Sequence, residues 1–160
     1  MGIPLHLLKY VEDRELLREL ADDEDPEVRA LVAGNVNCPE DALRKLAKDE
    51  SKMVRCLVAS NPSTPVDVLE EFFRMYKEGD SEMGSHIACN PSAPEWMLEE
   101  LSEVGDGMID FHIAGNRNAP ERALRLVYER AKGNIVILDL LKRNEATPED
   151  IRIELMSQSK

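Results

Sequence analysis

The feature that most constrains this chain is a short motif in which an asparagine is followed, four residues later, by a proline. The motif occurs five times, at residues 35–39, 61–65, 90–94, 116–120 and 144–148. Its prolines lie 26, 29, 26 and 28 residues apart. A near-constant period of this size is typical of proteins built from stacked repeats. The chain is therefore expected to fold as an array of similar units.

Aligning the copies on the asparagine predicts a helix before the motif. Apolar residues stand seven and three positions before the asparagine in every copy, and this spacing of four places them on one helical face. They are Val28 and Val32, Val54 and Val58, Met83 and Ile87, Ile109 and Ile113, and Ile137 and Leu141. Alanine stands two positions before the asparagine in four copies, with Lys142 in the fifth. The alanine column predicts close packing between helices.

A second, longer helix is predicted after the motif. Leucine stands four residues after the proline in four copies, with Arg152 in the fifth, and the seventh residue is apolar in all five. Proline suits the first position of a helix, where its missing N–H needs no partner. The helix is therefore expected to begin at the motif proline, with the preceding residue as N-cap. Thr64 and Thr147 suit that role.

Such a unit of two helices cannot bury its apolar face alone, so stacking must complete the core. The sequence predicts an all-α solenoid whose repeats contain about 26–29 residues, and no segment resembles a strand. We expect a single repeat domain over residues 1–160. Within it, residues 1–25 form an N-terminal cap and a degenerate repeat, 26–143 the core repeats and 144–160 a capping helix.

The residues of these units resemble the leucine-rich repeat variant family. The resemblance rests on Val28–Asn35 and Val54–Pro65, and on Leu46, Ala47 and Asp49 in the linker. It covers roughly residues 13–157. It implies a right-handed superhelix in which α-helices alternate with short 3₁₀ helices, so the shorter helix of each repeat is α-helical or 3₁₀. It also implies a binding or scaffolding role rather than catalysis.

The same resemblance bears on cofactors. The best-known member of the family carries an iron–sulfur cluster in a cysteine-rich N-terminal segment, but this chain has no cysteine before Cys38. We therefore expect no cofactor. The three cysteines, Cys38, Cys56 and Cys89, are odd in number and lack Cys-x-x-Cys spacing, which favours a reducing, cytoplasmic location.

Composition narrows the range of partners. A formal net charge of −12 argues against nucleic acid, because phosphate binding needs a basic surface. No apolar run approaches the ~20 residues of a membrane helix, and the N-terminus has neither the basic segment nor the cleavage site of a signal peptide. A single glutamine beside abundant Glu, Lys and Arg resembles the composition of thermophile proteins.

The motif residues themselves are predicted to be structural. Asparagine side chains satisfy the backbone of their own turn and can pair with neighbouring turns, so a buried ladder is expected. Its members are Asn35, Asn61, Asn90, Asn116 and Asn144, with Pro39, Pro65, Pro94, Pro120 and Pro148.

Departures from the repeat indicate a candidate interface. Trp96 stands two residues after its proline, where the other copies have a charged residue, so it is predicted to lie partly on the surface. Val66, next to its proline, is expected to contribute. An exposed tryptophan with an apolar neighbour is a common interface anchor, although local packing of the ring is the alternative.

Basic residues gather after Asn116. Residues 1–114 carry 11 Lys/Arg and 25 Asp/Glu, whereas residues 115–160 carry 9 and 7. Arg117, Arg122 and Arg125 could support head-to-tail self-association or an anion site, or could pair with carboxylates on a solvated face.

No sequence pattern indicates catalysis or a metal site. His86 and His112 share one position in consecutive repeats, and stacked helices lie about 8–10 Å apart, too far for such a pair to share one zinc. We expect a non-enzymatic repeat scaffold that binds another protein or itself. The alternatives are a nucleic-acid-binding solenoid that uses the C-terminal arginines, and a metal-assisted activity at the histidines.

Overall fold

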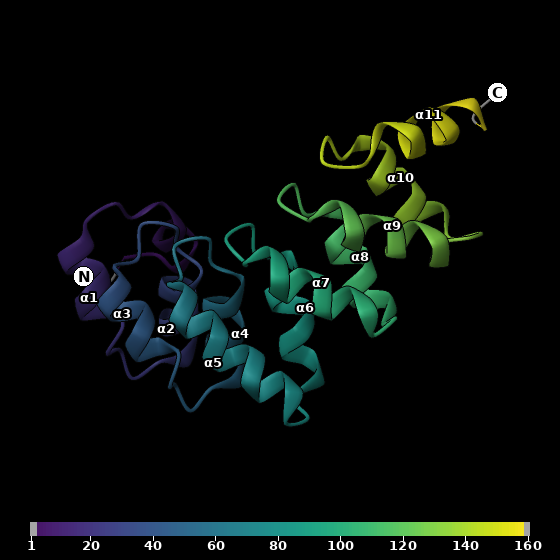
Figure 1. Ribbon diagram of the computed structural model, residues 1–160. Coiled ribbons are helices and arrows are strands. Elements are labelled where there is room, and N and C mark those ends of the chain that lie inside the picture. Colours follow the sequence, from purple (N-terminus) through teal and green to yellow (C-terminus); the bar gives the residue numbers. More distant parts are fainter. Residues whose placement is uncertain (1–2, 159–160) are drawn as a thin grey trace. The chain divides into compact units, whose positions relative to one another are not determined.

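The computed structural model describes residues 3–158 (Figure 1). All the regular secondary structure in that range is helical. A 3₁₀ helix, η1 (Leu5–Tyr10), comes first. The α-helices are α1 (Arg14–Leu20), α2 (Pro26–Ala33), α3 (Glu40–Leu46), α4 (Lys52–Ser60), α5 (Val66–Lys77), α6 (Ser81–Cys89), α7 (Glu95–Glu103), α8 (Gly107–Gly115), α9 (Glu121–Arg130), α10 (Ile135–Arg143) and α11 (Glu149–Ser157). The predicted all-α repeat fold is confirmed.

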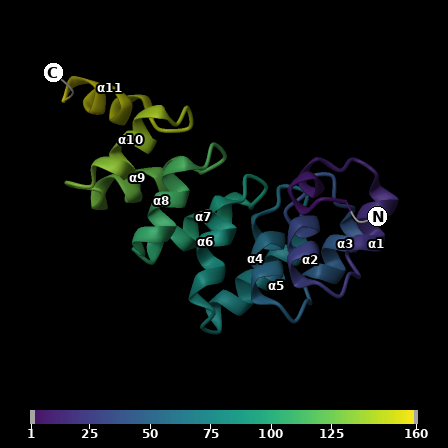
Figure 2. The same cartoon turned by 180° about the vertical axis from the view of Figure 1, so that it is seen from behind.

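The chain divides into two compact units, the first ending at Gly79 and the second beginning at Asp80. In the first unit, η1 packs on α2 and α2 packs on α4. In the second unit, α6, α8 and α10 stack in a row, and α7 packs on α9 (Figures 1 and 2). Within each unit, the first helices of consecutive repeats therefore lie side by side, as a solenoid requires.

The buried core is formed by the aligned apolar columns. In the first unit, Val54 and Val58 of α4 have no exposed surface, and in the second unit the same is true of Ile113 of α8. The alanine column is equally buried: Ala33, Ala59, Ala88 and Ala114 each have 0% exposed surface. A methyl group at this position lets the neighbouring helix backbone approach closely, as the sequence predicted.

The second helix of each repeat begins one residue later than predicted. Each motif proline is the N-cap, and its ψ angle lies between 140° and 153°. This extended backbone places the first helical residue after the proline. Thr64 therefore does not cap the helix, and its hydroxyl donates instead to the Val58 carbonyl at 2.6 Å. At the start of α2, by contrast, Asp25 is the N-cap and Pro26 the first helical residue, as expected.

Helix type and length also differ from the simplest expectation. The first helices, α2, α4, α6, α8 and α10, are α-helices of eight or nine residues, and η1 is the one 3₁₀ helix in residues 3–158. Apolar pairs four residues apart match the 3.6 residues per turn of an α-helix better than the 3.0 of a 3₁₀ helix. Only α5 and α9 are longer than the first helix of their repeat.

Candidate interaction surface

Within each compact unit, motif asparagines tie one turn to the turn before it. Asn61 Nδ2 donates to the carbonyls of Ala33 at 2.6 Å and Asn35 at 2.9 Å, and its Oδ1 accepts from the Ser63 N–H at 2.8 Å. In the second unit, Asn144 makes the same bonds to Ala114, Asn116 and Ala146. All five motif asparagines are at most 5% exposed. The amide groups of Asn61 and Asn144 are thus hydrogen-bonded to backbone groups within the fold.

A second row of hydrogen bonds runs beside the first. The residue two positions after the asparagine reaches back to a carbonyl near the preceding turn. Asn37 Nδ2 donates to Val11, and Ser63 Oγ donates to Val36 at 2.6 Å. Asn118 Nδ2 donates to Pro91. The signal in the sequence is a small polar residue at this position in four of the five copies, a column that the asparagine–proline motif does not include.

Ion pairs join the second helices of consecutive repeats. Arg44 pairs with Asp67 in the first unit. Arg125 pairs with Asp150 in the second unit, and its two guanidinium nitrogens lie 2.8 and 3.1 Å from the two carboxylate oxygens. Hydrogen bonds from these arginines hold the pKa values of both aspartates below their usual range. Arg122 lies 2.7 Å from Glu103, and in this pair the carboxylate belongs to the earlier helix and the arginine to the later one. Exposed pairs of this kind contribute little stability.

A second kind of ion pair lies within a single repeat and is more buried. Arg29 Nε lies 2.7 Å from Asp49 Oδ2, and Arg29 also donates to the carbonyls of Asp23 and Glu24. Burial favours the protonated form of Asp49, but hydrogen bonds from Arg29 and the Ser51 N–H outweigh it and lower the pKa of Asp49.

The second unit contains the same pair with its charges exchanged. Asp110 stands at the aligned position of Arg29, and Arg130 at that of Asp49. Arg130 Nη2 lies 2.7 Å from Asp110 Oδ1, and Arg130 also donates to the Ser102 carbonyl. The two columns, compared as a pair, could have indicated this contact from sequence.

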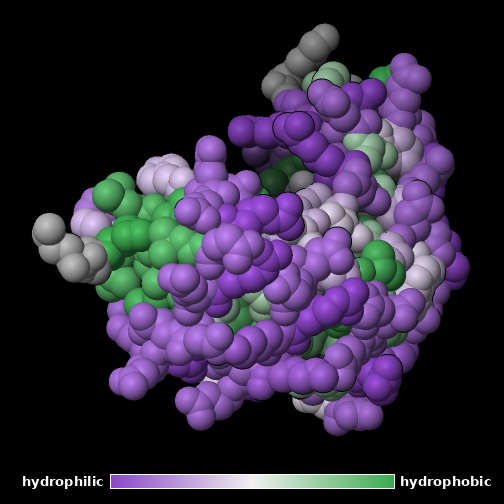
Figure 3. Space-filling view, turned by 90° about the vertical axis from the view of Figure 1, so that its left-hand side faces the viewer, coloured by the Kyte–Doolittle hydropathy of each residue, from purple (hydrophilic) through white to green (hydrophobic). Residues whose placement is uncertain are grey.

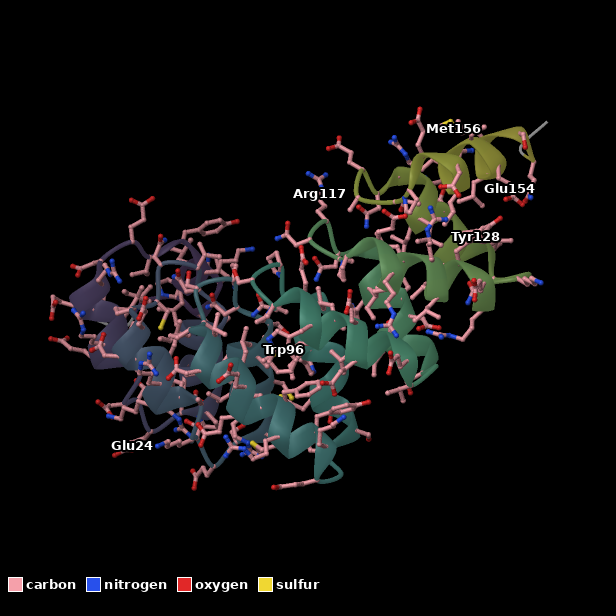
Figure 4. The ribbon with its side chains drawn as sticks, viewed as in Figure 1. Glu24, Trp96, Arg117, Tyr128, Glu154 and Met156 are labelled. Carbon is pink, nitrogen blue, oxygen red and sulfur yellow. The ribbon has the colours of Figure 1, made fainter. Side chains whose placement is uncertain are left out.

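The apolar members of the candidate interface are both exposed. Trp96 lies in the first turn of α7 (Figure 4) and is 44% exposed. Val66 is the first residue of α5 and is 47% exposed. They belong to different compact units. In the aligned position of Trp96, other repeats place Asp67 and Asp150, which bind arginines of the preceding repeat.

Of the three candidate arginines, only Arg117 is outside the ion pairs. It lies in the turn between α8 and α9, and its side chain projects away from the ribbon (Figure 4). It forms no ion pair with the residues that the structure describes. Together with Pro91, Pro94 and Glu95, it lines a shallow surface depression between two turns. Arg122 and Arg125 are each bound to carboxylates instead.

His86 and His112 are half-buried. His86 Nε2 is 4.0 Å from a carboxylate oxygen of Glu82, one helical turn away. The His112 ring packs edge-on against Phe111, with ring centres 5.3 Å apart. Burial and, secondarily, the charge of His86 lower the pKa of His112.

The cysteines form no disulfide among the described residues, and the acidic run provides a helix cap and an ion-pair partner. Burial raises the pKa of Cys38 to about 11, so that its thiol is protonated at neutral pH. In the run at residues 22–25, Asp25 accepts from the Glu27 N–H as N-cap of α2, and Asp22 pairs with Lys45.

Comparison with known families identifies one of the repeats. The model of the family described as leucine rich repeat variant matches residues 26–51, the stretch that contains α2, the first asparagine turn and α3. No curated protein and no solved structure was found to match the chain. Within the described residues, no helix has the length and apolar character needed to cross a membrane. The match supports the family expected from sequence over this stretch: in this helical repeat protein, residues 26–51 are similar to a leucine rich repeat variant repeat.

Proposed function

We propose that this chain is a non-enzymatic scaffold that binds another protein through the surface around Trp96. The observation that carries the proposal is that the chain's one tryptophan is 44% exposed at a position where other repeats place a charged residue. A large, rigid indole offers much contact area with little loss of conformational entropy, and tryptophan is enriched among residues that dominate binding energy.

The surroundings of Trp96 indicate the chemistry of the partner. The helix that carries it, α7, has the sequence EWMLEELSE and contains four glutamates. Glu95 is exposed beside Trp96, while Glu99 and Glu103 lie near Arg122. We expect the partner to present an apolar pocket with lysine or arginine at its rim, because complementary charges favour encounter and register.

Other features support this proposal over the alternatives. Arg122 and Arg125, which a nucleic-acid-binding surface would use, are bound to carboxylates of their own unit. The chain carries an excess of 12 negative charges, which opposes phosphate binding. The three cysteines form no disulfide among the described residues, which is compatible with a cytoplasmic site of action.

Affinity capture followed by cross-linking tests the proposal. The tagged protein would be recovered from its native host, and bound proteins quantified for the wild type, Trp96→Ala and Met53→Ala. Met53 is the matched control, since it is an apolar side chain that is 50% exposed on another helix. We expect one partner, cross-linked next to α7, that Trp96→Ala loses and Met53→Ala retains. Equal recovery with all three proteins would reject Trp96 as the anchor.

A further inference from the structure

Arg55 is anchored in the first unit in the same way as its counterpart in the preceding repeat. Arg29 and Arg55 both stand six residues before a motif asparagine. Nη1 of Arg29 donates to two consecutive linker carbonyls at 2.8 and 3.1 Å, and Nη1 of Arg55 does the same at 2.7 and 2.9 Å. These two bonds fix the guanidinium group, so its other edge, formed by Nε and Nη2, has a defined position.

In two other repeats, the Nε–Nη2 edge of an arginine binds a carboxylate. Arg29 Nε and Nη2 lie 2.7 and 3.1 Å from the two oxygens of Asp49. Arg130 Nε and Nη2 lie 3.0 and 2.7 Å from those of Asp110. Such parallel bonds are strong and selective, because the planar fork of arginine matches the geometry of a carboxylate.

The same edge of Arg55 has no carboxylate. Its Nε is buried and has no hydrogen-bond partner among the described residues, and its guanidinium group forms no ion pair with them. The position that supplies Asp49 to Arg29 holds Met75 in this repeat. Met75 lies within α5, whereas Asp49 lies in the linker beyond the shorter α3. In this repeat the aligned residue is therefore helical and apolar.

Comparison of the five repeats shows that this departure is specific. In each of the other four repeats, the two aligned positions hold either opposite charges or no charge. The pairs are Arg29 with Asp49, Asp110 with Arg130, Gly84 with Val104, and Leu138 with Gln158. Arg55 with Met75 is the one pair in which a charge is present and its counterpart is missing.

A buried N–H without an acceptor is unusual in a native fold. Figure 3 shows mainly hydrophilic side chains on the side of the first unit that it draws, apart from a hydrophobic area at the N-terminal end. Exposed polar groups of this kind are hydrated, whereas Nε of Arg55 is removed from water, which is costly for a charged group unless an acceptor binds it. Arg55 as a whole is half-buried, so a ligand can approach its guanidinium group from solvent.

We propose that the Nε–Nη2 edge of Arg55 binds a carboxylate supplied by another molecule, in the geometry that Asp49 adopts on Arg29. An acidic side chain of a protein and a free carboxylic acid both offer the two coplanar oxygens that this edge fits. The charge of Asp49 is compensated by Arg29 at 2.7 Å, and more distant acidic residues are screened beyond about 8 Å at physiological salt. The proposal is independent of Trp96 and of the partner proposed above.

NMR spectroscopy of the arginine side chains in the intact chain tests the proposal. Sodium acetate is the probe, and sodium chloride at equal concentration controls for ionic strength. We expect acetate, but not chloride, to move the Arg55 Nε–H resonance downfield, with half-saturation on the order of 1–10 mM for a single ion pair. The resonances of Arg29 and Arg130, which already bind carboxylates, should stay in place. Loss of the resonance in Arg55→Lys assigns it.

Substitutions at Met75 provide the matched variants. Met75→Asp supplies a carboxylate from the chain itself, as Asp49 does for Arg29, and should abolish the response to acetate. Met75→Leu keeps the position apolar and should respond like the wild type. Circular dichroism verifies folding, and Met75→Glu replaces Met75→Asp if that variant loses helix. The proposal is overturned if acetate leaves the wild-type Arg55 resonance in place, or if the response persists in the folded acidic variant.

A peptide distinguishes the two sources of the carboxylate. The probe is a five-residue peptide with blocked ends, one glutamate and four alanines, titrated like acetate. Half-saturation at a concentration at least about tenfold lower than for acetate supports the site and assigns it to an acidic protein segment. Equal half-saturation supports the site and assigns it to a free carboxylic acid.

Discussion

At the scale of single residues, Asn61 shows how one side chain joins two repeats. Its amide donates to two backbone carbonyls of the preceding repeat and its oxygen accepts from its own turn, all while 2% exposed. Asn61→Ala leaves these backbone groups without partners in a buried place. We expect a loss of about 1–3 kcal/mol in unfolding free energy, measured by urea denaturation.

A neighbouring asparagine provides the control. Asn37 donates a single, longer bond of 3.3 Å at an exposed position. Asn37→Ala should therefore change the unfolding free energy by less than about 0.5 kcal/mol, as is usual for surface substitutions. Equal losses in the two variants would show that the buried ladder contributes no more than an ordinary surface bond.

His112 is predicted to make stability depend on pH. Because burial lowers its pKa in the folded state, the unfolded chain binds more protons as pH falls. Its favourable contribution is complete above the ordinary histidine pKa of about 6.5 and is lost as pH falls through the lower folded value. Leucine occupies this position in three other repeats. We expect His112→Leu to reduce the fall in Tm between about pH 8 and pH 5.5.

The comparison for His112 is an exposed histidine. His6 lies on η1 at the surface, and His6→Ala should leave the pH profile of Tm as in the wild type. A profile that is unchanged in His112→Leu would assign the pH dependence to other groups.

At the scale of helices, sequence reasoning succeeded where one residue type determines one local conformation. The asparagine turns and the apolar columns recur in every repeat, so each copy of the pattern supports the structure predicted for the others. The start of the second helix was wrong by one residue, because a proline φ near −60° suits both an N-cap and a first helical residue. Only the ψ angle, which no residue preference determines, separates the two cases.

The ion pairs were harder to predict because they depend on pairs of positions. A column that contains both Arg29 and Asp110 has no consistent charge, and it gains meaning only when compared with the column of Asp49 and Arg130. Tertiary contact preserves the pair while the sign at each position is free to change.

A charge exchange tests whether the two sites are equivalent. Arg130→Asp places two carboxylates together, one of them the 7% exposed side chain of Asp110, and we expect a loss of about 2–4 kcal/mol. Adding Asp110→Arg should recover most of it, because the double variant reproduces the arrangement of Arg29 and Asp49. Chemical denaturation of the single and double variants measures the coupling.

The exchange has a clear negative result. The double variant Asp110→Arg with Arg130→Asp could be no more stable than Arg130→Asp alone. The surroundings of the two ion pairs would then differ, and the geometry that Arg29–Asp49 and Arg130–Asp110 share would not determine their contribution to stability.

At the scale of the whole molecule, the division after Gly79 predicts how the chain unfolds. Each unit has its own buried residues, such as Val32 and Leu43 in the first and Ile113 and Leu124 in the second, all 0% exposed. Gly79 itself has φ of +119°, a conformation that suits glycine. We therefore expect fragments 1–79 and 80–160 to fold separately, with helical circular dichroism and cooperative melting. Their stability should be small, since domains of this size bury only about 60% of their surface. If residues 1–160 instead form the single repeat domain expected from sequence, both fragments should lose their helix, because repeats in such an array depend on their neighbours.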